Sequence, residues 1–210
     1  MTGRNIGIVV LAAGGSSRLG VAKQLLEFEG KTILRRAAEN ALHCNAGPVF
    51  VVLGNDFERS KKEIADLSLA IIFNRAWGDG IASSIKIAVD KIVHDCPAIS
   101  SVMFTLCDQP WVDHRTLSKI AEAFRPNDTK IVASEYNGTL GVPAIFDVRL
   151  FKELRQLEGD AGAKSIIYKY FNDVVRVAVP EAAFDIDSAA DYERLVLEAK
   201  RKDHANGPVC

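Results

Sequence analysis

Short apolar runs and amphipathic stretches alternate along the first half of the chain. Each run of β-branched and large hydrophobic residues is followed by a stretch in which hydrophobic positions recur every three or four residues. A short continuous apolar run predicts a buried strand, and the longer periodic stretch predicts a helix. The predicted strands are 6–10, 48–53, 70–73 and 102–106. The predicted helices between them are 31–42, 58–67 and 83–94, and Thr32 is a candidate cap for the first of them. Because parallel strands need such crossover helices, this order predicts an α/β protein with a mostly parallel sheet.

Beyond residue 124 the pattern changes. Two short strand patterns, 130–135 and 143–146, flank Asn137-Gly138, a dipeptide that is typical of tight hairpin turns. They predict a small antiparallel excursion near 131–146. The remaining predicted elements are helices at 150–157, after a break at 158–162 up to about 171, and at 189–202, with a strand at 174–179. We expect one domain over 1–203 and a frayed tail over 204–210.

Composition and charge narrow the class of protein. Hydrophobic residues make up 48% of the chain and charged residues 25%, which is ordinary for a globular protein. A net charge of −1 provides no basic field for nucleic acid and no polybasic membrane anchor. The four cysteines form no C-x-x-C pair, which favours reduced thiols over a disulfide scaffold or a zinc site. We therefore expect a cytoplasmic protein that binds neither nucleic acid nor membranes.

A small-residue loop directly follows the first predicted strand. It spans 11–20 and reads L-A-A-G-G-S-S-R-L-G, with Lys23 three residues beyond it. Backbone N–H groups can approach an anion closely only where side chains are small. The two cations Arg18 and Lys23 add the positive charge that a polyphosphate needs. The pattern predicts a phosphate-binding loop, and the alternative is a βα connection with two solvated charges. The predicted nucleotide-binding residues are Leu11, Ala12, Ala13, Gly14, Gly15, Arg18 and Lys23.

Two common phosphate-binding motifs are absent from this loop. A Walker-type loop requires Lys-Ser or Lys-Thr after its last glycine, but Gly20 is followed by Val21-Ala22. The dinucleotide fingerprint requires G-x-G-x-x-G, and Gly14-Gly15-Ser16 does not fit its spacing.

Asp108 follows the fourth predicted strand and is expected at the same edge of the sheet as the glycine loop. A carboxylate beside a polyphosphate site is well placed to hold Mg²⁺, which binds carboxylate and phosphate oxygens together. Pro110 ends further strand pairing. The alternative is a turn aspartate that caps the next helix.

A second pair of carboxylates precedes the last predicted helix. In an extended segment Asp185 and Asp187 lie on the same side, with Ile186 on the other. One of them is a candidate second metal ligand, and the other is a candidate cap for the helix. Capping alone would also explain Asp187-Ser188, because both residue types are common there.

Two turns rich in glycine and polar residues remain, at 74–84 and 159–163. The first leads into a predicted helix, whose N-terminus could bind an acceptor phosphate through Ser83 and Ser84. Its alternative is a helix cap with Trp77 packed in the core, and the second turn could be a lid. The predicted acceptor-binding residues are Asn74, Trp77, Gly80, Ser83, Ser84, Gly159, Asp160 and Gly162. The four histidines have no partner nucleophile, so we interpret them as surface or packing residues.

Taken together, these blocks resemble the MobA-like nucleotidyltransferase family, and within it they are most similar to the molybdenum cofactor cytidylyltransferases. The first block is shared by many nucleotidyltransferases, whereas the G-D-x-G-A turn after G-x-P is more specific. The matching blocks are 11–20, Lys23-Gln24-Leu25-Leu26, 74–84, Leu106-Cys107-Asp108-Gln109-Pro110, Gly141-Val142-Pro143, 159–163 and Asp185-Ile186-Asp187-Ser188.

The resemblance implies a Rossmann-like, three-layer α/β/α fold and a nucleotidyl transfer. CMP would move from CTP to the terminal phosphate of molybdopterin, and pyrophosphate would be released. The loop amides with Arg18 and Lys23 would hold the triphosphate. Asp108 and Asp187 would bind Mg²⁺. Arg18, Lys23 and Asp108 are thus the predicted catalytic residues. A molybdenum hydroxylase apo-enzyme is a further expected partner.

Three rival interpretations remain open. A guanylyltransferase of the same pathway is expected to have Gly where this chain has Ala13, so Ala13 favours CTP. A cytidylyltransferase of isoprenoid synthesis is expected to carry His-Asp-x-x-Arg-Pro after the fourth strand, and that signature is missing. A non-catalytic cofactor carrier would not need Arg18, Lys23 and Asp108 together. Family members vary at Gln109 and Trp111, so these residues leave the exact acceptor open.

Overall fold

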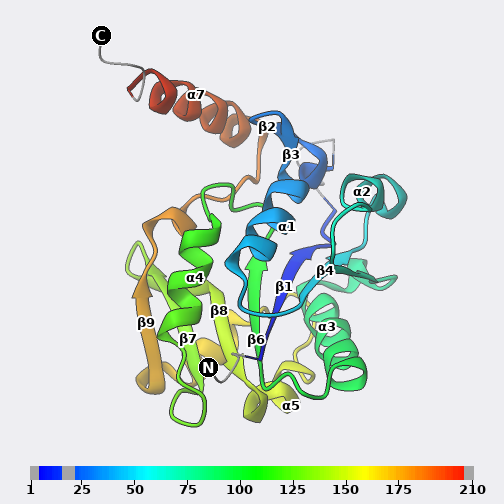
Figure 1. The fold of residues 1–210 in the computed structure, drawn as a ribbon, viewed down its shortest axis with the longest axis vertical. Helices are drawn as coiled ribbons and strands as arrows, with labels where there is room; N and C mark the ends of the chain where they lie inside the picture. The colour runs from blue at the N-terminus through cyan, green and yellow to red at the C-terminus, as the bar shows by residue number, and fades with distance from the viewer. Residues whose placement is uncertain (1–4, 16–21, 206–210) are drawn as a thin grey trace.

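The fold is built on a seven-stranded sheet with the strand order β5-β4-β1-β6-β8-β7-β9 (Figure 1). The computed structural model describes residues 5–15 and 22–205. Every strand except β8 runs in the same direction, since β8 pairs antiparallel with both of its neighbours. The strands are β1 (Ile6–Ala12), β4 (Val49–Leu53), β5 (Ala70–Phe73), β6 (Ser101–Leu106), β7 (Ile131–Tyr136), β8 (Thr139–Asp147) and β9 (Val174–Ala178).

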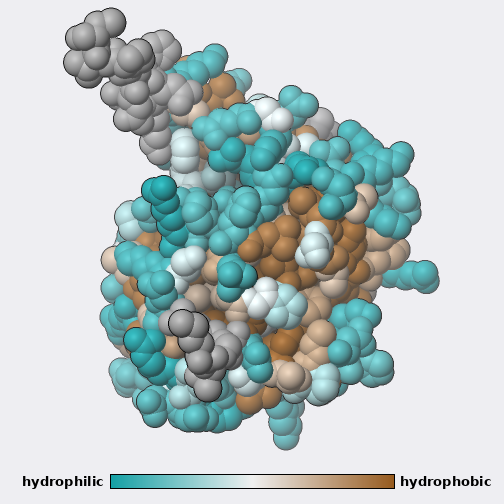
Figure 2. Space-filling view, in the orientation of Figure 1, coloured by the Kyte–Doolittle hydropathy of each residue, from teal (hydrophilic) through white to brown (hydrophobic). Residues whose placement is uncertain are grey.

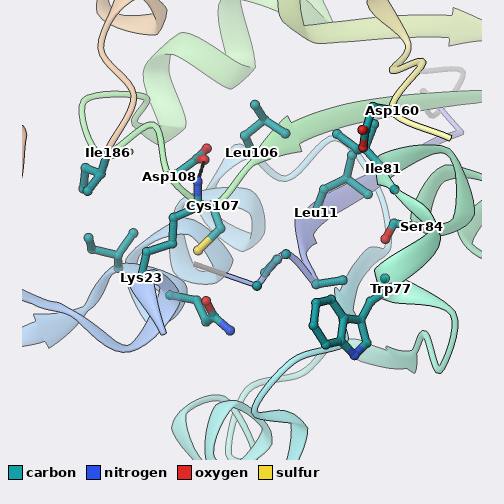
Figure 3. Close-up of a pocket in the computed structure, with 18 residues that line it drawn as sticks. Leu11, Lys23, Trp77, Ile81, Ser84, Leu106, Cys107, Asp108, Asp160 and Ile186 are labelled. Carbon is teal, nitrogen blue, oxygen red and sulfur yellow. Dashed lines mark hydrogen bonds and ion pairs between the residues drawn. The ribbon is translucent and has the colours of Figure 1, made fainter. Parts of the chain in front are cut away.

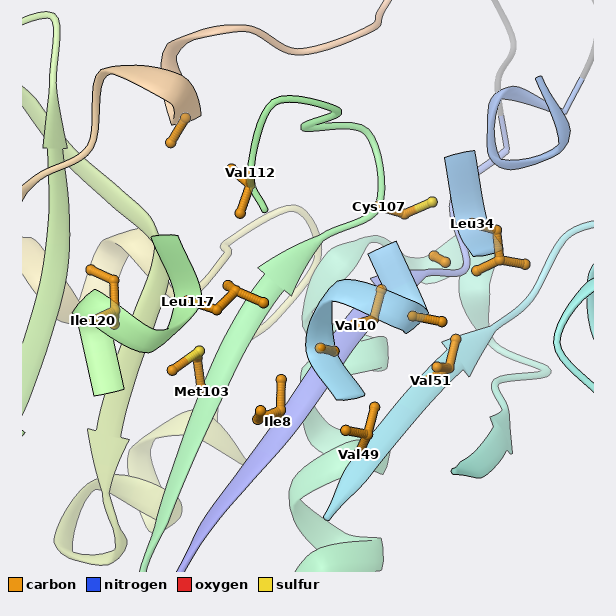
Figure 4. Close-up of a cluster of buried hydrophobic side chains, with 14 of the residues drawn as sticks. Ile8, Val10, Leu34, Val49, Val51, Met103, Cys107, Val112, Leu117 and Ile120 are labelled. Carbon is orange, nitrogen blue, oxygen red and sulfur yellow. The ribbon is translucent and has the colours of Figure 1, made fainter. Parts of the chain in front are cut away.

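Two hydrophobic cores cover the two faces of this sheet. Along β1, Ile8 and Val10 enter one core, whereas Val9 and Leu11 enter the other, as the two-residue period of a strand requires. Helices α1 (Ile33–Cys44), α4 (His114–Ala123) and α7 (Ala189–Ala205) belong to the first core, part of which Figure 4 shows. Helices α3 (Ile81–Asp95), α5 (Phe151–Leu154) and α6 (Lys164–Lys169) belong to the second. The expected three-layer, Rossmann-like architecture is therefore confirmed.

Shorter elements connect these layers. Helix α2 (Phe57–Glu63) joins β4 to β5. A separate two-stranded sheet is formed by β2 (Glu27–Phe28) and β3 (Lys31–Thr32). The 3₁₀ turns are η1 (Lys23–Leu25), η2 (Trp77–Asp79), η3 (Val148–Leu150), η4 (Phe171–Asp173) and η5 (Pro180–Ala183).

The expected antiparallel hairpin forms, and its second strand, β8, lies inside the main sheet. Asn137 and Gly138 turn with positive φ angles of 48° and 70°, as a tight hairpin requires. The second half of β8 then pairs with β6, from Ser101 to Phe104, while its whole length pairs with β7. Strand β8 is thus inserted into the main sheet. Its residues are buried on both faces, which stabilises a central position.

Helix ends follow local capping chemistry. The hydroxyl of Thr32 accepts a hydrogen bond from the N–H of Arg35 at 3.2 Å, which confirms the predicted cap of α1. Helix α2 is shorter than predicted and ends at Glu63, because the N–H of Ile64 bonds to the carbonyl of Lys61 in a tighter 3₁₀ turn. Helix α7 continues to Ala205, two residues into the segment expected to fray.

The surface in Figure 2 is polar around most of its outline, and hydrophobic residues gather near α1 and β4. Within the described ranges, no helix has the length and apolar character needed to cross a bilayer.

Candidate active site

The carboxyl ends of β1 and β6 bring the glycine loop and Asp108 together. The two strands are parallel neighbours with Leu11 opposite Leu106, so the segments that follow them emerge side by side. A cavity of about 390 Å³ lies at this edge of the sheet (Figure 3). Such an edge is where open α/β sheets bind ligands. The cavity is lined by Leu11, Ala12, Ala13, Gly14, Gly15, Lys23, Gln24, Ile33, Trp77, Gly78, Gly80, Ile81, Ser84, Leu106, Cys107, Asp108, Asp160 and Ile186.

Lys23 forms ion pairs with two carboxylates at one end of the cavity. Its Nζ donates a hydrogen bond to Oδ2 of Asp108, and Oδ1 of Asp187 lies 3.4 Å away. Burial alone would lower the pKa of Lys23, but the Asp108 and Asp187 carboxylates raise the pKa above its ordinary value. Lys23 is therefore a cation at neutral pH, and it is held where two acidic groups converge.

The two carboxylate oxygens of Asp108 differ, because only Oδ2 accepts a hydrogen bond from Lys23. Its Oδ1 is buried and has no hydrogen-bond partner among the described residues. The capping alternative for Asp108 is wrong, because Asp113 caps α4 by accepting from the N–H of Thr116 at 2.9 Å. The backbone carbonyl of Asp108 instead accepts from the N–H of Ile186 at 3.0 Å, which ties the 185–187 segment to this edge.

The donor set fits Mg²⁺ held partly by a nucleotide. Within residues 5–15 and 22–205, no three His, Cys, Asp or Glu side chains gather closely enough to hold a metal by themselves. Mg²⁺ usually takes one or two carboxylates plus phosphate oxygens and waters, so it does not need such a cage. The unpartnered Oδ1 of Asp108 and the exposed carboxylate of Asp187 would supply the two protein ligands.

The 185–191 segment caps the last helix through residues other than the two aspartates. The hydroxyl of Ser188 accepts from the N–H of Asp191 at 3.3 Å, and Oδ2 of Asp191 accepts from the N–H of Ser188 at 2.9 Å. This reciprocal pattern is a capping box. The hypothesis that Asp185 or Asp187 caps this helix is therefore wrong, and both side chains are left for other functions.

The opposite end of the cavity contains several of the predicted acceptor residues. Figure 3 places Trp77, Ser84 and Asp160 away from the Lys23–Asp108 pair, and Gly80 also lines the cavity there. Gly80 has a φ of 92°, and a Cβ at this position would lie 2.3 Å from the carbonyl oxygen of Gly159. Only glycine allows the two turns to approach so closely.

Other predicted acceptor residues form hydrogen bonds within the chain at this end of the cavity. Asn74 is 2% exposed, and its amide donates to the hydroxyls of Ser83 and Ser84 at 2.8 and 2.9 Å. The N–H groups of Ala82 and Ser83 bond to the carbonyls of Gly159 and Gly80. These first amides of α3 are thus already satisfied within the chain. A Cβ at Gly162 would lie 3.6 Å from Cγ2 of Ile81, in ordinary van der Waals contact. Contact of these residues with an acceptor stays a prediction.

The glycine loop is anchored where it leaves β1. The carbonyl of Ala13 accepts from the N–H of Asn55 at 3.1 Å, and the carbonyl of Leu11 accepts from the N–H of Cys107 at 3.2 Å. All five predicted residues from Leu11 to Gly15 line the cavity. Arg18 lies outside the described residues.

The structure adds residues to the site that sequence reasoning did not assign to it. Complete burial raises the pKa of the Cys107 thiol, and the neighbouring Asp108 raises it further, so this group is not a nucleophile at neutral pH. Gln24 is 2% exposed and donates to the carbonyl of Asn55 at 3.1 Å, which supports the loop anchor. Its place directly after Lys23 was the available signal. The other additions are Ile33, Gly78, Ile81, Leu106 and Ile186.

Comparison with known families decides the class. The family model described as MobA-like NTP transferase domain matches residues 8–174. The chain belongs to the MobA-like NTP transferase family. The matched range of this MobA-like chain includes the glycine loop, Lys23 and Asp108, whereas Asp187 lies beyond its end.

Relatives of this MobA-like chain differ in name. It is 27% identical over 199 residues to nicotine blue oxidoreductase of Paenarthrobacter nicotinovorans, which covers 90% of this chain and 95% of that protein. It is 25% identical over 189 residues to the molybdenum cofactor cytidylyltransferase of Escherichia coli, which covers 89% and 93% respectively. The names of these relatives do not agree, so they do not identify a specific reaction. That has to follow from the geometry of the site.

Solved structures give the same fold. Rv0371c from Mycobacterium tuberculosis superposes with a TM-score of 0.80 at 29% identity, over 93% of this chain and 100% of that chain. Its complex with manganese gives 0.76 at 26% identity, over 91% and 98%. A divalent metal thus binds a relative of the MobA-like chain.

The position of Asp185 beside this carboxylate cluster gives a testable pH dependence. Partial burial, followed by the negative charge of Asp108, raises the pKa of Asp185 to about 6 from its ordinary 3.8. Between these values the folded protein holds the proton more tightly than the unfolded chain does, so its stability falls as the pH rises, and the loss persists at pH 7. In metal-free and nucleotide-free protein, we expect Asp185→Asn to melt at a higher temperature than the parent at pH 7.

This difference should shrink as the pH approaches 4, where the parent is protonated. Thermal unfolding between pH 4 and 7.5, in a chelating buffer, measures it. If the melting temperatures of the variant and the parent change with pH in parallel, Asp185 does not destabilise the folded protein in this way.

Proposed function

We propose that this protein transfers CMP from CTP to the terminal phosphate of a molybdopterin-type acceptor and releases pyrophosphate in a Mg²⁺-dependent reaction. One observation carries the proposal. A glycine loop, a half-buried lysine cation and a carboxylate with an unpartnered oxygen line the same cavity, although they come from separate segments of the chain. Family membership supports the nucleotidyl transfer. The similarity to a molybdenum cofactor cytidylyltransferase supports the choice of CTP and acceptor.

The reaction needs positioning and charge neutralisation rather than covalent catalysis. An oxygen of the acceptor phosphate forms a bond to the α-phosphorus of CTP. The bond from that phosphorus to the bridging oxygen breaks, and its electron pair leaves with pyrophosphate. The attacking phosphate is already anionic, so no protein base has to remove a proton. A divalent cation bound by Asp108 and Asp187 would supply positive charge to the phosphate oxygens.

Lys23 is suited to change its ion-pair partners when the triphosphate binds. Without ligand its ammonium is balanced by Asp108 and Asp187. A triphosphate that arrives with a cation offers Lys23 new anionic partners and gives the two carboxylates a replacement positive charge. The flexible lysine stem allows this exchange of partners without movement of the backbone. Lys23 would then stabilise the charge that develops on the phosphate oxygens.

A direct assay tests the proposal. Pyrophosphate release is measured with CTP, GTP, ATP or UTP, each with and without Mg²⁺, in the presence of a molybdopterin-type acceptor. We expect release that depends on CTP, metal and acceptor. Oxidation of NADH or NADPH is followed in parallel, because one relative bears the name of an oxidoreductase. Nucleotide-independent redox turnover, or no binding of any nucleoside triphosphate, would contradict the proposal. Tight CTP binding without pyrophosphate release would instead favour a carrier.

Ala13 provides a test of nucleobase choice. It is 5% exposed and lines the cavity at the entry of the glycine loop. Its methyl group fills space that a purine's second ring would need, and discrimination by such apolar contacts is usually about 10- to 200-fold. We expect a preference for CTP over GTP of this size, which Ala13→Gly should narrow without abolishing turnover. Competition between equimolar CTP and GTP measures the ratio, and a parent protein that prefers GTP would contradict the cytidylyl assignment.

A further inference from the structure

The indole of Trp77 occupies the space of two missing side chains. A Cβ at Gly54 would lie 2.5 Å from Cβ and 2.8 Å from Cγ of Trp77, at the root of the side chain. A Cβ at Gly15 would lie 2.7 Å from Cζ3 and 3.1 Å from Cη2, at the far edge of the ring. One rigid ring therefore reaches from the end of β4 to the glycine loop.

The contact explains why residue 15 is glycine. The φ angle of Gly15 is not in the left-handed region, so its backbone would accept an L-residue. The three nearest heavy atoms to a Cβ at this position, at 2.7, 3.1 and 3.7 Å, all belong to the ring of Trp77. A Cβ at the neighbouring Gly14 would meet nothing within 4 Å. Trp77 thus restricts one glycine of the loop and not the other.

Hydrogen bonds hold the backbone on both sides of Trp77. The carbonyl of Ala76 accepts from the N–H of Asp79 at 3.0 Å within η2. The side-chain oxygen of the buried Asn74 accepts from the N–H of Ala76 at 3.0 Å, and the N–H of Asn74 donates to the carbonyl of Leu53 at 2.8 Å. These bonds fix the backbone from which the ring projects, and the root of the side chain lies beside Gly54. Figure 3 shows Trp77 at the edge of the cavity, and it is 37% exposed, so one part of it contacts the chain and another faces solvent.

We propose that Trp77 is a positioning residue for nucleotide binding. Its far ring edge fixes Gly15, and thereby sets the path of residues 11–15, the described part of the glycine loop, whose amides would hold the triphosphate. This inference rests on the proposed function, but it assigns Trp77 to the nucleotide through the loop rather than to the acceptor. The described part of the loop is thus anchored by backbone bonds at Leu11 and Ala13 and by the ring of Trp77 beside Gly15.

A double-mutant cycle tests the proposal. Trp77→Phe keeps Cβ and Cγ against Gly54 but removes the outer atoms that reach Gly15. Nucleotide affinity is measured by isothermal titration with CTP and Mg²⁺, without acceptor, so that an acceptor contact cannot influence it. We expect Trp77→Phe to weaken binding several-fold and Gly15→Ala to weaken it about tenfold or more, since small misplacements of binding groups are costly. In the Trp77→Phe background, Gly15→Ala should weaken binding by less than about twofold, because its methyl group then has room.

Two comparisons control the cycle. The effect of Gly14→Ala should be the same in both backgrounds, because its Cβ meets no part of the ring. Phe171→Ala removes an aromatic ring of similar exposure, 40%, that is not part of the cavity lining, and should leave the affinity unchanged. Melting temperatures show that each variant is folded, and if Gly15→Ala alone fails to fold, recovery of folding and binding in the double variant is the expected result.

The outcomes separate the two proposals. If the parent binds CTP and the effects of Gly15→Ala are equal in both backgrounds, Trp77 does not position the loop and this inference is overturned, while the proposed function stands. If Trp77→Phe leaves CTP affinity unchanged and raises only the KM for the acceptor, Trp77 belongs to the acceptor site. If the parent binds no nucleoside triphosphate, both proposals fall.

Discussion

Asp108→Asn is expected to lower Mg²⁺-dependent turnover on the order of 10²- to 10³-fold, the scale of losing one preorganised electrostatic group. The substitution keeps the shape of the side chain but removes the negative charge that Mg²⁺ prefers. The buried Oδ1, which has no partner among the described residues, is the atom whose function would be lost. Steady-state rates over a Mg²⁺ titration measure the effect, and metal-free nucleotide binding should change much less.

Matched variants test whether this loss of turnover arises from the metal site. Asp187→Asn should show the same dependence on Mg²⁺ if the two carboxylates share the ion. Asp113→Asn makes the same chemical change at the cap of α4, away from the cavity lining, and asparagine caps helices well. It should therefore retain the parent rate. If Asp108→Asn and Asp187→Asn titrate with Mg²⁺ as the parent does, the metal assignment is wrong.

Lys23→Ala should lose most of the transferase activity, again on the order of 10²- to 10³-fold, while the protein remains folded. Its ammonium is the cation that the described part of the structure places between Asp108 and Asp187 at one end of the cavity. Loss of this charge removes a partner for the triphosphate and leaves two carboxylates repelling it. Rates and circular dichroism of the same preparations measure activity and fold together.

Lys31→Ala is the control for a lost lysine. Nζ of Lys31 lies 2.6 Å from Oε2 of Glu39, a residue of α1, and Lys31 does not line the cavity. Exposed ion pairs of this kind contribute little to stability. We expect the parent rate from this variant. A folded Lys23→Ala protein with a kcat/KM near that of the parent would remove Lys23 from the site.

The hydrophobic pattern alone was enough for most of the fold. Strands β1, β4 and β6 are continuous apolar runs because both of their faces are buried, and α1 is periodic because one face is buried. Local chemistry also predicted the cap at Thr32 and the turn at Asn137-Gly138. These features depend on residues close together in the chain, so periodicity and capping rules can predict them.

The place of β8 could not be read in this way. Its apolar residues would suit an edge hairpin or a central strand equally, because both bury hydrophobic side chains. Pairing with β6 is a contact between Phe104 and Ala144, and between Ser101 and Asp147, which are far apart in the chain. No local signal marks such a partner.

The site shows the same division. Strand order and the small-residue loop predicted that the glycine loop and Asp108 share one edge of the sheet, because parallel neighbours end together. The pairing of Lys23 with Asp108 and Asp187 spans 85 and 164 positions, and the helix cap formed by Ser188 and Asp191 leaves those aspartates available. The sequence left both capping and metal binding open for these aspartates, and the three-dimensional contacts excluded capping.

The glycine loop and Trp77 illustrate most clearly what the sequence alone could not predict. The sequence determined that residues 14 and 15 are small, and so predicted an anion-binding loop. Only the tertiary structure distinguished them, because the ring of Trp77, 62 positions beyond Gly15 by their residue numbers (77 − 15), fills the space beside that glycine and not beside Gly14. Composition and local pattern determine which segments become strands, helices and tight turns. Which side chains then meet is decided by how the sheet is assembled, since the energies that select those meetings come from contacts between distant segments.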